Sequence, residues 1–149
     1  MHHELSLPSN PCSVGPAHPT VLLPLIDARI ACGFSSPAAD YEESTLDLNT
    51  YVIRNRAASF YFMVTGTSMI GAGICDGDRV AVDRSITPRH DHIVLAVVDQ
   101  SYTLKRLYQR RGVIELRSEN PDFPPIRFQE GEELVIWGVV IGVIRRLAY

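Results

Sequence analysis

The chain has 149 residues, of which 46% are hydrophobic and 21% are charged, a composition typical of one globular domain. Its formal net charge is −3 and its pI is near 5.9, which argues against a general nucleic-acid-binding surface, because such surfaces are usually basic. The longest apolar run, 134–144, is shorter than the roughly 20 residues that a membrane-spanning helix needs, so we expect a buried strand there and no contact with a membrane.

Residues 1–45 differ in composition from the rest and predict a flexible, extended N-terminal arm. They hold six of the ten prolines and show no sustained hydrophobic periodicity. One apolar island, Val21–Ile26, leads toward the Cys32–Gly33 peptide bond. This bond is unusually bare, because Cys32 has a small side chain and Gly33 has none. Either the island docks the arm onto the domain, or it belongs to a peptide held in a groove with this bond accessible.

The cysteines and the N-terminus indicate a cytoplasmic protein. Cys12, Cys32 and Cys75 are odd in number and widely spaced, which favours reduced thiols over a disulfide framework. No N-terminal segment has the basic-then-apolar pattern of a signal peptide.

Residues 46–149 predict a mainly β domain, curled or barrel-like. We expect one short helix, Leu46–Ile53, capped by Asp47, and a final strand bent at Gly138 or Gly142. Alternating or continuous apolar runs between turn residues predict strands over Phe60–Val64, Arg79–Asp83, His92–Asp99, Tyr102–Tyr108, Val113–Arg117, Ile126–Phe128 and Leu134–Leu147.

The tetrapeptide Gly66-Thr67-Ser68-Met69 is the first candidate for chemistry. It follows an aromatic-rich strand, and Gly66 permits a sharp turn there. A serine at the end of a rigid strand projects its hydroxyl into a cleft, where neighbouring backbone N–H groups form an oxyanion site. The alternative is an ordinary turn serine.

A serine nucleophile needs a base, and the folded region offers two kinds. His90 and His92 flank an aspartate, so a serine–histidine–aspartate triad stays open, although the spacing does not favour it. Lys105 is the chain's single lysine, beside thirteen arginines, and burial would lower its pKa enough for it to act as a base. Its alternative role is to keep an edge strand soluble.

Several motifs together resemble the serine–lysine self-cleaving family of LexA and UmuD, the S24 peptidases. The resemblance covers about residues 22–147. The segment before the cleavage site, residues 1–20, is too short and proline-rich for a helix-turn-helix domain, which favours the UmuD-like branch. The motifs that carry the resemblance are Ala31–Phe34, Ser36–Tyr41, Leu46–Asn49, Gly66–Met69, Asp76–Asp78, Thr103–Leu107, Ser118–Pro121 and Trp137–Ile144. Thr67 stands where relatives vary.

The resemblance implies a LexA C-terminal-type β domain that cuts its own arm. Ser68 would attack the carbonyl of Cys32, neutral Lys105 would carry the proton to the amine of Gly33, and the backbone N–H groups of Thr67 and Ser68 would hold the oxyanion. No metal or cofactor is needed. Gly33 and Ser68 are 35 positions apart, a stretch that spans up to about 120 Å when extended, so cleavage within one chain and cleavage between subunits both stay open.

The resemblance also implies a role in the bacterial SOS response. The protein would be a homodimer whose self-cleavage is stimulated by the RecA filament on single-stranded DNA. The shortened product would join a UmuC-like Y-family polymerase for translesion synthesis, without sequence-specific DNA binding of its own. Two alternatives stay open: a non-cleaving interaction subunit, and a serine–lysine peptidase that acts on foreign substrates.

Overall fold

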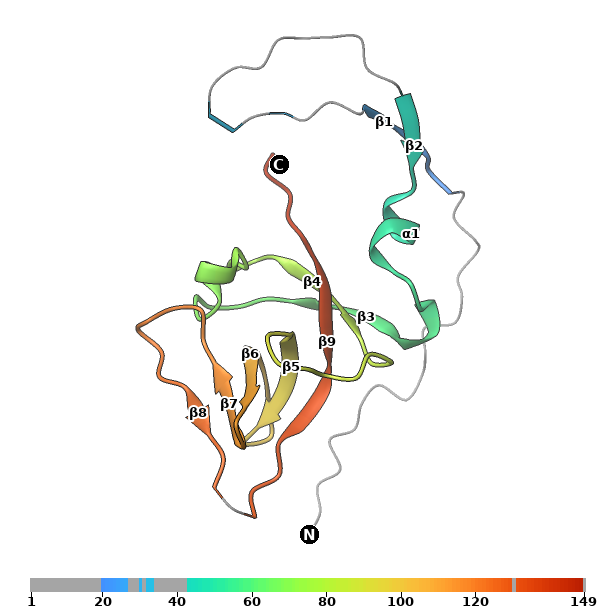
Figure 1. The fold of residues 1–149 in the computed structure, drawn as a ribbon. Coiled ribbons are helices and arrows are strands. Elements are labelled where there is room, and N and C mark those ends of the chain that lie inside the picture. Colours follow the sequence, from blue (N-terminus) through green and yellow to red (C-terminus); the bar gives the residue numbers. More distant parts are fainter. Residues whose placement is uncertain (1–19, 27–29, 31, 34–42, 130, 149) are drawn as a thin grey trace. The chain divides into compact units, whose positions relative to one another are not determined.

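The computed structural model describes residues 20–26, 30, 32–33, 43–129 and 131–148 (Figure 1). The chain divides into two units, Met1–Tyr51 and Val52–Tyr149. Each unit is described on its own below.

In the first unit, two short strands form an antiparallel pair that the sequence did not predict. Strand β1 (Leu23–Ile26) pairs with β2 (Glu43–Leu46), with Leu23 opposite Leu46. The predicted helix is confirmed as α1 (Leu48–Val52), but it begins after Leu46 because that residue ends β2. Its cap is also confirmed, since the Asp47 Oδ1 accepts the Asn49 N–H at 3.0 Å.

The second unit is a seven-stranded sheet in which all paired strands are antiparallel, in the order β3-β4-β9-β5-β6-β7-β8. The mainly β, curled fold is thereby confirmed. Two 3-10 turns, η1 (Arg56–Ala58) and η2 (Ile70–Ala72), flank the first of these strands. The strands are β3 (Ser59–Met63), β4 (Arg79–Asp83), β5 (Ile93–Val98), β6 (Ser101–Arg110), β7 (Val113–Arg117), β8 (Ile126–Arg127) and β9 (Val135–Ile144).

Strand β9 curls the sheet, because it pairs with two different neighbours along its length (Figure 1). Its first half pairs with β5 and its second half with β4. The register shifts by one residue at each pairing, which leaves Trp137 and Ile141 as the extra residues of two bulges. Each bulge lies next to a predicted bend, Gly138 or Gly142, and bulges increase the local twist of a strand.

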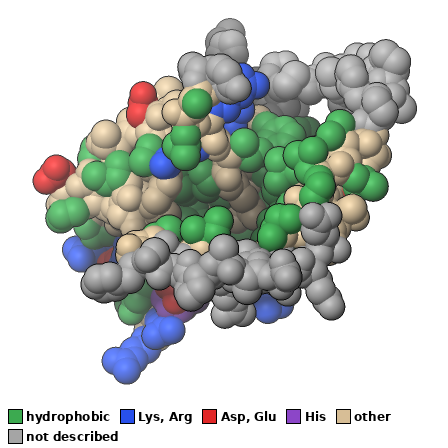
Figure 2. Space-filling view, turned by 90° about the horizontal axis from the view of Figure 1, so that it is seen from above, with side chains coloured by type: hydrophobic (Ala, Val, Ile, Leu, Met, Phe, Trp, Pro, Cys, Tyr) green, Lys and Arg blue, Asp and Glu red, His purple; other side chains and the backbone are tan. Residues whose placement is uncertain are grey.

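Two hydrophobic clusters lie on opposite faces of β5. Leu95 packs in the cluster of Val64, Met69 and Val80, whereas Val94 packs in the cluster that includes Leu107. The predicted strand is therefore buried on both faces, as is typical of a continuous apolar run. Hydrophobic side chains also reach the surface (Figure 2), among them those of Tyr61 and Met63 on the edge strand β3.

Candidate active site

A sharp turn at Gly66 places Ser68 directly after strand β3. The pairing of β3 with β4 is extended by the Val64 N–H, which donates to the Asp78 carbonyl at 2.8 Å. Gly66 then adopts a φ of 89°, in the left-handed region that favours glycine. Its N–H donates to the Asp76 Oδ1 at 2.7 Å, so the predicted turn is present and is held by a carboxylate.

The second candidate, Lys105, lies in the middle of β6 and reaches Ser68. Its Nζ is 3.1 Å from the Ser68 Oγ. The same nitrogen donates to the Thr103 Oγ1 at 3.0 Å and to the Leu104 carbonyl at 2.9 Å. Thr103 is on the same face of β6 because side chains alternate along a strand, so the strand itself fixes where the amine points.

The surroundings of Lys105 disfavour its charged form. The residue is only 7% exposed, and desolvation by burial lowers the pKa of its amine from the usual value of 10.5. Among the described residues, no carboxylate forms an ion pair with it. The ammonium ion therefore lacks the opposite charge that normally stabilises a buried cation.

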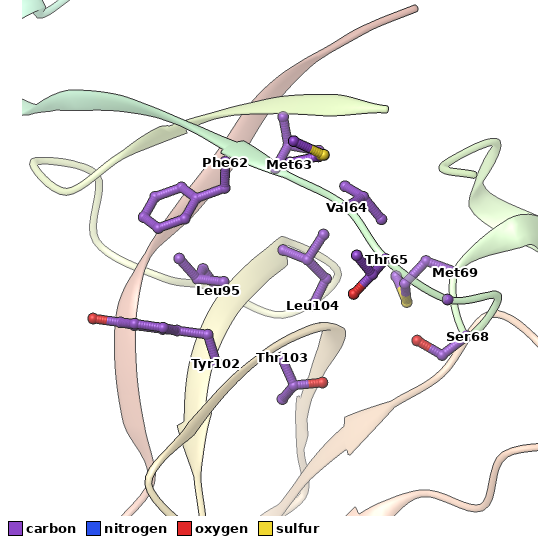
Figure 3. A pocket seen from close by; sticks show the side chains of 12 residues that line it. Phe62, Met63, Val64, Thr65, Ser68, Met69, Leu95, Tyr102, Thr103 and Leu104 are labelled. Atoms are coloured by element: carbon purple, nitrogen blue, oxygen red, sulfur yellow. The ribbon is translucent and has the colours of Figure 1, made fainter. Parts of the chain in front are cut away.

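A pocket of about 150 Å³ with both polar and apolar surface opens beside Ser68. Figure 3 shows Ser68 and Met69 at one end of the pocket and Phe62 and Tyr102 at the other. Its walls come from β3, the Ser68 loop and strands β4, β5 and β6, through Phe62, Met63, Val64, Thr65, Gly66, Met69, Val80, Leu95, Tyr102, Thr103 and Leu104.

A second loop, Ser118–Asn120, supports the loop that carries Ser68. The Glu119 N–H donates to the Ser68 carbonyl at 2.9 Å, and the Glu119 carbonyl accepts the Gly71 N–H at 2.7 Å. A Cβ at Gly71 would lie 2.5 Å from that carbonyl oxygen, so only glycine allows this approach. The Asn120 Nδ2 donates to the Thr67 carbonyl at 3.0 Å.

The amide groups predicted to form an oxyanion site have no competing acceptor. Within the described part of the chain, the N–H groups of Thr67 and Ser68 donate to no protein atom. Ser68 itself is partly exposed, whereas the next residue, Met69, is 2% exposed and anchors the loop in the core. The free amides and the hydroxyl thus belong to one firmly seated turn.

The two histidines form hydrogen bonds with residues other than Ser68. The His90 Nδ1 accepts the Gln109 N–H at 3.2 Å, and the His92 Nδ1 accepts the Arg89 N–H at 3.2 Å. Of the two kinds of base considered from the sequence, the lysine is the one that the structure brings to the serine.

Cys32 and Gly33, the residues of the expected cleavage bond, form a bend in the first unit, and both are exposed. A Cβ at Gly33 would meet no heavy atom within 4 Å. The other residues expected near this bond, Ala31 and 34–42, lie outside the described residues.

Neither a metal centre nor a membrane span emerges from the part of the chain that the structure describes. No group of three or more histidine, cysteine, aspartate or glutamate side chains there is arranged to hold a metal ion. No helix among the same residues is long and apolar enough to cross a membrane.

Sequence reasoning assigned no role to Thr103 or Asn120, the two polar residues that complete the site. Thr103 was visible as the residue two positions before Lys105, on the same strand face. Asn120 was visible only as part of a motif, because its partner Thr67 is 53 positions away.

An ion pair between a buried aspartate and an exposed arginine secures the far end of the Ser68 loop. The Arg145 guanidinium donates to both carboxylate oxygens of Asp78 at 2.6 Å and to the Gly73 carbonyl at 2.8 Å. Asp78 is 1% exposed, and its hydrogen bond with Arg145 lowers the pKa of the carboxyl to about 2. The carboxylate also accepts the Cys75 N–H at 2.7 Å, so one arginine ties the segment 73–78 to the end of β9.

In this mainly β fold, a serine after β3 lies within hydrogen-bonding distance of a lysine on β6. Such a pair is of the kind found in serine peptidases that use lysine. The chain belongs to the Peptidase S24-like family, whose sequence model matches residues 24–141.

Individual relatives place the chain among the UmuD-like members of this family. It is 44% identical over 124 residues to protein ImpA of Salmonella typhimurium, which covers 83% of both chains. It is 40% identical over 119 residues to protein MucA of Escherichia coli, covering 79% of this chain and 81% of that protein. It is also 37% identical over 125 residues to the LexA repressor of Paracidovorax citrulli, covering 84% of this chain but 55% of the repressor.

Replacing Arg145 by Met should destabilise the second unit in a pH-dependent way. The cost near pH 7 should be about 1–3 kcal/mol, because the substitution leaves a buried carboxylate without its charged donor. The folded-state pKa of Asp78, about 2, lies below its ordinary value of 3.8. Stability from the pair is therefore fully present above about pH 4 and is lost as the pH falls toward 2.

The measurement is urea unfolding of wild type and Arg145→Met at pH 7, 5, 4 and 3. Arg146→Met, at the exposed next residue, is the matched control and should change the free energy of unfolding by less than about 0.5 kcal/mol. A wild-type advantage that stays constant down to pH 3 would contradict the assignment.

Proposed function

We propose that this protein is a self-cleaving serine peptidase in which Ser68 is the nucleophile and Lys105 the general base, and that it cuts its own Cys32–Gly33 bond. The observation that carries the proposal is the 3.1 Å contact between the Lys105 Nζ and the Ser68 Oγ, made by an amine whose burial lowers its pKa. Membership of the S24 family supports the same chemistry.

The hydrogen-bond partners of Lys105 suit a neutral amine. A neutral amine has two N–H groups and one lone pair. The Leu104 carbonyl, which only accepts, and the Thr103 hydroxyl oxygen take the two N–H groups at 2.9 and 3.0 Å. The lone pair is then directed at the third neighbour, the Ser68 hydroxyl, from which it accepts the proton.

The first half of the reaction is acyl transfer. Ser68 Oγ forms a bond to the carbonyl carbon of Cys32 while its proton passes to the Lys105 Nζ. The resulting oxyanion is held by the backbone N–H groups of Thr67 and Ser68. When the C–N bond breaks, Lys105 returns the proton to the nitrogen of Gly33, which becomes a new amino terminus, and Cys32 is left as an ester of Ser68.

The second half is hydrolysis of that ester. Lys105, neutral again, takes a proton from water, and the hydroxide attacks the same carbonyl carbon. Breakage of the ester bond regenerates the Ser68 hydroxyl with the proton held by Lys105. The net reaction consumes one water and gives residues 1–32 and 33–149, so the chain supplies all of the catalytic groups.

Residues 1–45 serve in this proposal as the flexible arm and residues 46–149 as the peptidase domain. The UmuD-like relatives support a place in SOS mutagenesis: a cytoplasmic homodimer, stimulated by the RecA filament on single-stranded DNA, whose product is the accessory subunit of a UmuC-like Y-family polymerase. The acidic pI of about 5.9 fits a protein that meets DNA through its partners.

Substitution of either catalytic residue should abolish self-cleavage without unfolding the domain. We expect Ser68→Ala, Lys105→Ala and Lys105→Arg each to lower the first-order rate by at least about 10³-fold. Arginine fails as well because it does not give up its proton near neutral pH. Mass spectrometry of the purified protein, incubated with and without RecA filaments, measures the rate and should locate the new N-terminus at Gly33.

The matched control is Ser101→Ala, at the exposed first residue of β6, which should cleave at the wild-type rate. Circular dichroism checks that each variant is folded. Cleavage by Lys105→Arg at the wild-type rate would exclude the proposed base, and a cut at another bond would exclude the proposed substrate.

The rate of self-cleavage should rise with pH until Lys105 is neutral. Burial lowers the pKa of this amine from 10.5, so the midpoint of the profile should lie below that value. Below the midpoint the rate should change about tenfold per pH unit, in proportion to the neutral fraction. Rates are measured from pH 6 to 10, with circular dichroism at each pH as the control. A midpoint near 6.5 would instead indicate a histidine base.

A further inference from the structure

The oxyanion site depends on which way one peptide group faces. The carbonyl of Thr67 and the N–H of Ser68 belong to the same planar, trans peptide unit, so they point in opposite directions. Whatever holds the Thr67 carbonyl therefore also aims the Ser68 N–H. If this unit turned over, a carbonyl oxygen would face the developing oxyanion and repel it.

Asn120 is the residue that holds this carbonyl. It is 8% exposed, and its Nδ2 donates to the Thr67 carbonyl at 3.0 Å. Its Oδ1 accepts the Asp122 N–H at 3.0 Å. Because a backbone N–H only donates, it fixes the amide with the oxygen toward Asp122 and the NH₂ toward Thr67.

No other group in the described chain holds the Thr67 carbonyl as well. The remaining donor is the Ile70 N–H, at 3.4 Å, near the limit of a hydrogen bond. The next peptide unit is fixed independently, since the Ser68 carbonyl accepts the Glu119 N–H at 2.9 Å. The loop 118–120 therefore faces two successive carbonyls, so the N–H groups of Ser68 and Met69, which belong to the same two peptide units, point the opposite way.

We propose that Asn120 is a positioning residue for catalysis, which orients the Thr67–Ser68 peptide so that the Ser68 N–H faces the oxyanion. This inference rests on the proposed function, and it adds a residue that does not touch the reacting atoms. Its side chain acts only through the peptide unit, so its removal should weaken oxyanion stabilisation while leaving the basicity of Lys105 unchanged.

Asn120→Asp tests this with the smallest change. The variant keeps the Oδ1 that accepts the Asp122 N–H and replaces the NH₂ donor by an oxygen that repels the Thr67 carbonyl. We expect the plateau rate of self-cleavage to fall about 100-fold, with the midpoint of the pH profile unchanged. Asn55→Asp, at an exposed asparagine whose side chain caps no helix, adds the same charge and should cleave like wild type.

A second readout reports on the oxyanion site directly. A fluorophosphonate probe reacts with a nucleophilic serine through a transition state whose phosphoryl oxygen occupies the oxyanion position. Labelling of Ser68 should slow in Asn120→Asp in parallel with self-cleavage and at the same pH midpoint. A merely structural role would instead appear as a lower melting temperature, with labelling restored at reduced temperature.

The outcomes separate the two claims. If wild type neither cleaves itself nor reacts with the probe, the proposed function fails. If wild type does both and folded Asn120→Asp does so within threefold of it, the inference about Asn120 is overturned while the proposed function stands. If Asn120→Asp does not fold, the same test is made with Asn120→Ala, which removes the side-chain donor so that only water can replace it at the Thr67 carbonyl. Unfolding of both variants would overturn the inference by assigning Asn120 to stability alone.

Discussion

In the proposed reaction the amine of Lys105 has to lose its proton close to neutral pH, and this requirement constrains the rest of the second unit. An exposed lysine is almost entirely charged at pH 7. Desolvation is the cause of the lowered pKa here, and it depends on a position in the middle of a sheet. Strand β6 provides that position, because Lys105 lies opposite the fully buried Val94 of β5. Burying a charged lysine without a carboxylate partner destabilises a protein. This cost is offset only where the neutral amine has a role.

Placing the serine is a separate task, and loops perform it. The Ser68 turn is held by the Asp76 carboxylate at its start, by the 118–120 loop at its centre and by the pair of Asp78 and Arg145 at its end. The supporting loop is in turn tied to the strand of the base, because Arg106, next to Lys105, donates to the carboxylate of Glu119. Ser68 and Lys105 are therefore connected through the hydrogen bonds of Glu119 and the backbone between Arg106 and Lys105, so their separation does not depend on two independent loops.

The parts of this arrangement that the sequence predicted are those encoded locally. The apolar runs, the turn at Gly66 and the Asp47 cap each depend on residues within a few positions of one another, and each was found. The single lysine among thirteen arginines was recognised from the composition, which needs no knowledge of the fold. The pairing of β1 with β2 was missed because 16 residues separate the two strands, far more than in a tight hairpin. The two bulges of β9 were located only to their neighbouring glycines.

The supporting contacts at the site were missed for a different physical reason. Asn120 and Arg145 act on carbonyls and carboxylates that lie 53 and 67 positions away in the chain. No hydrophobic period or turn signal encodes such a polar contact, because it exists only after the sheet has formed. Candidate reactive groups are therefore easier to recognise in a sequence than the residues that orient them, although both are polar residues in loops or on strands.

A base of this kind is slow unless it is fully neutral, and the proposed substrate makes a slow base sufficient. In cleavage within one chain, Gly33 is only 35 positions from Ser68, so the arm reaches an effective concentration near the millimolar range and little binding energy is needed. Each molecule has to react only once. Under these conditions the proposed reaction does not require rapid turnover. In the proposed reaction the rate follows the neutral fraction of Lys105, which burial increases by lowering the pKa of the amine.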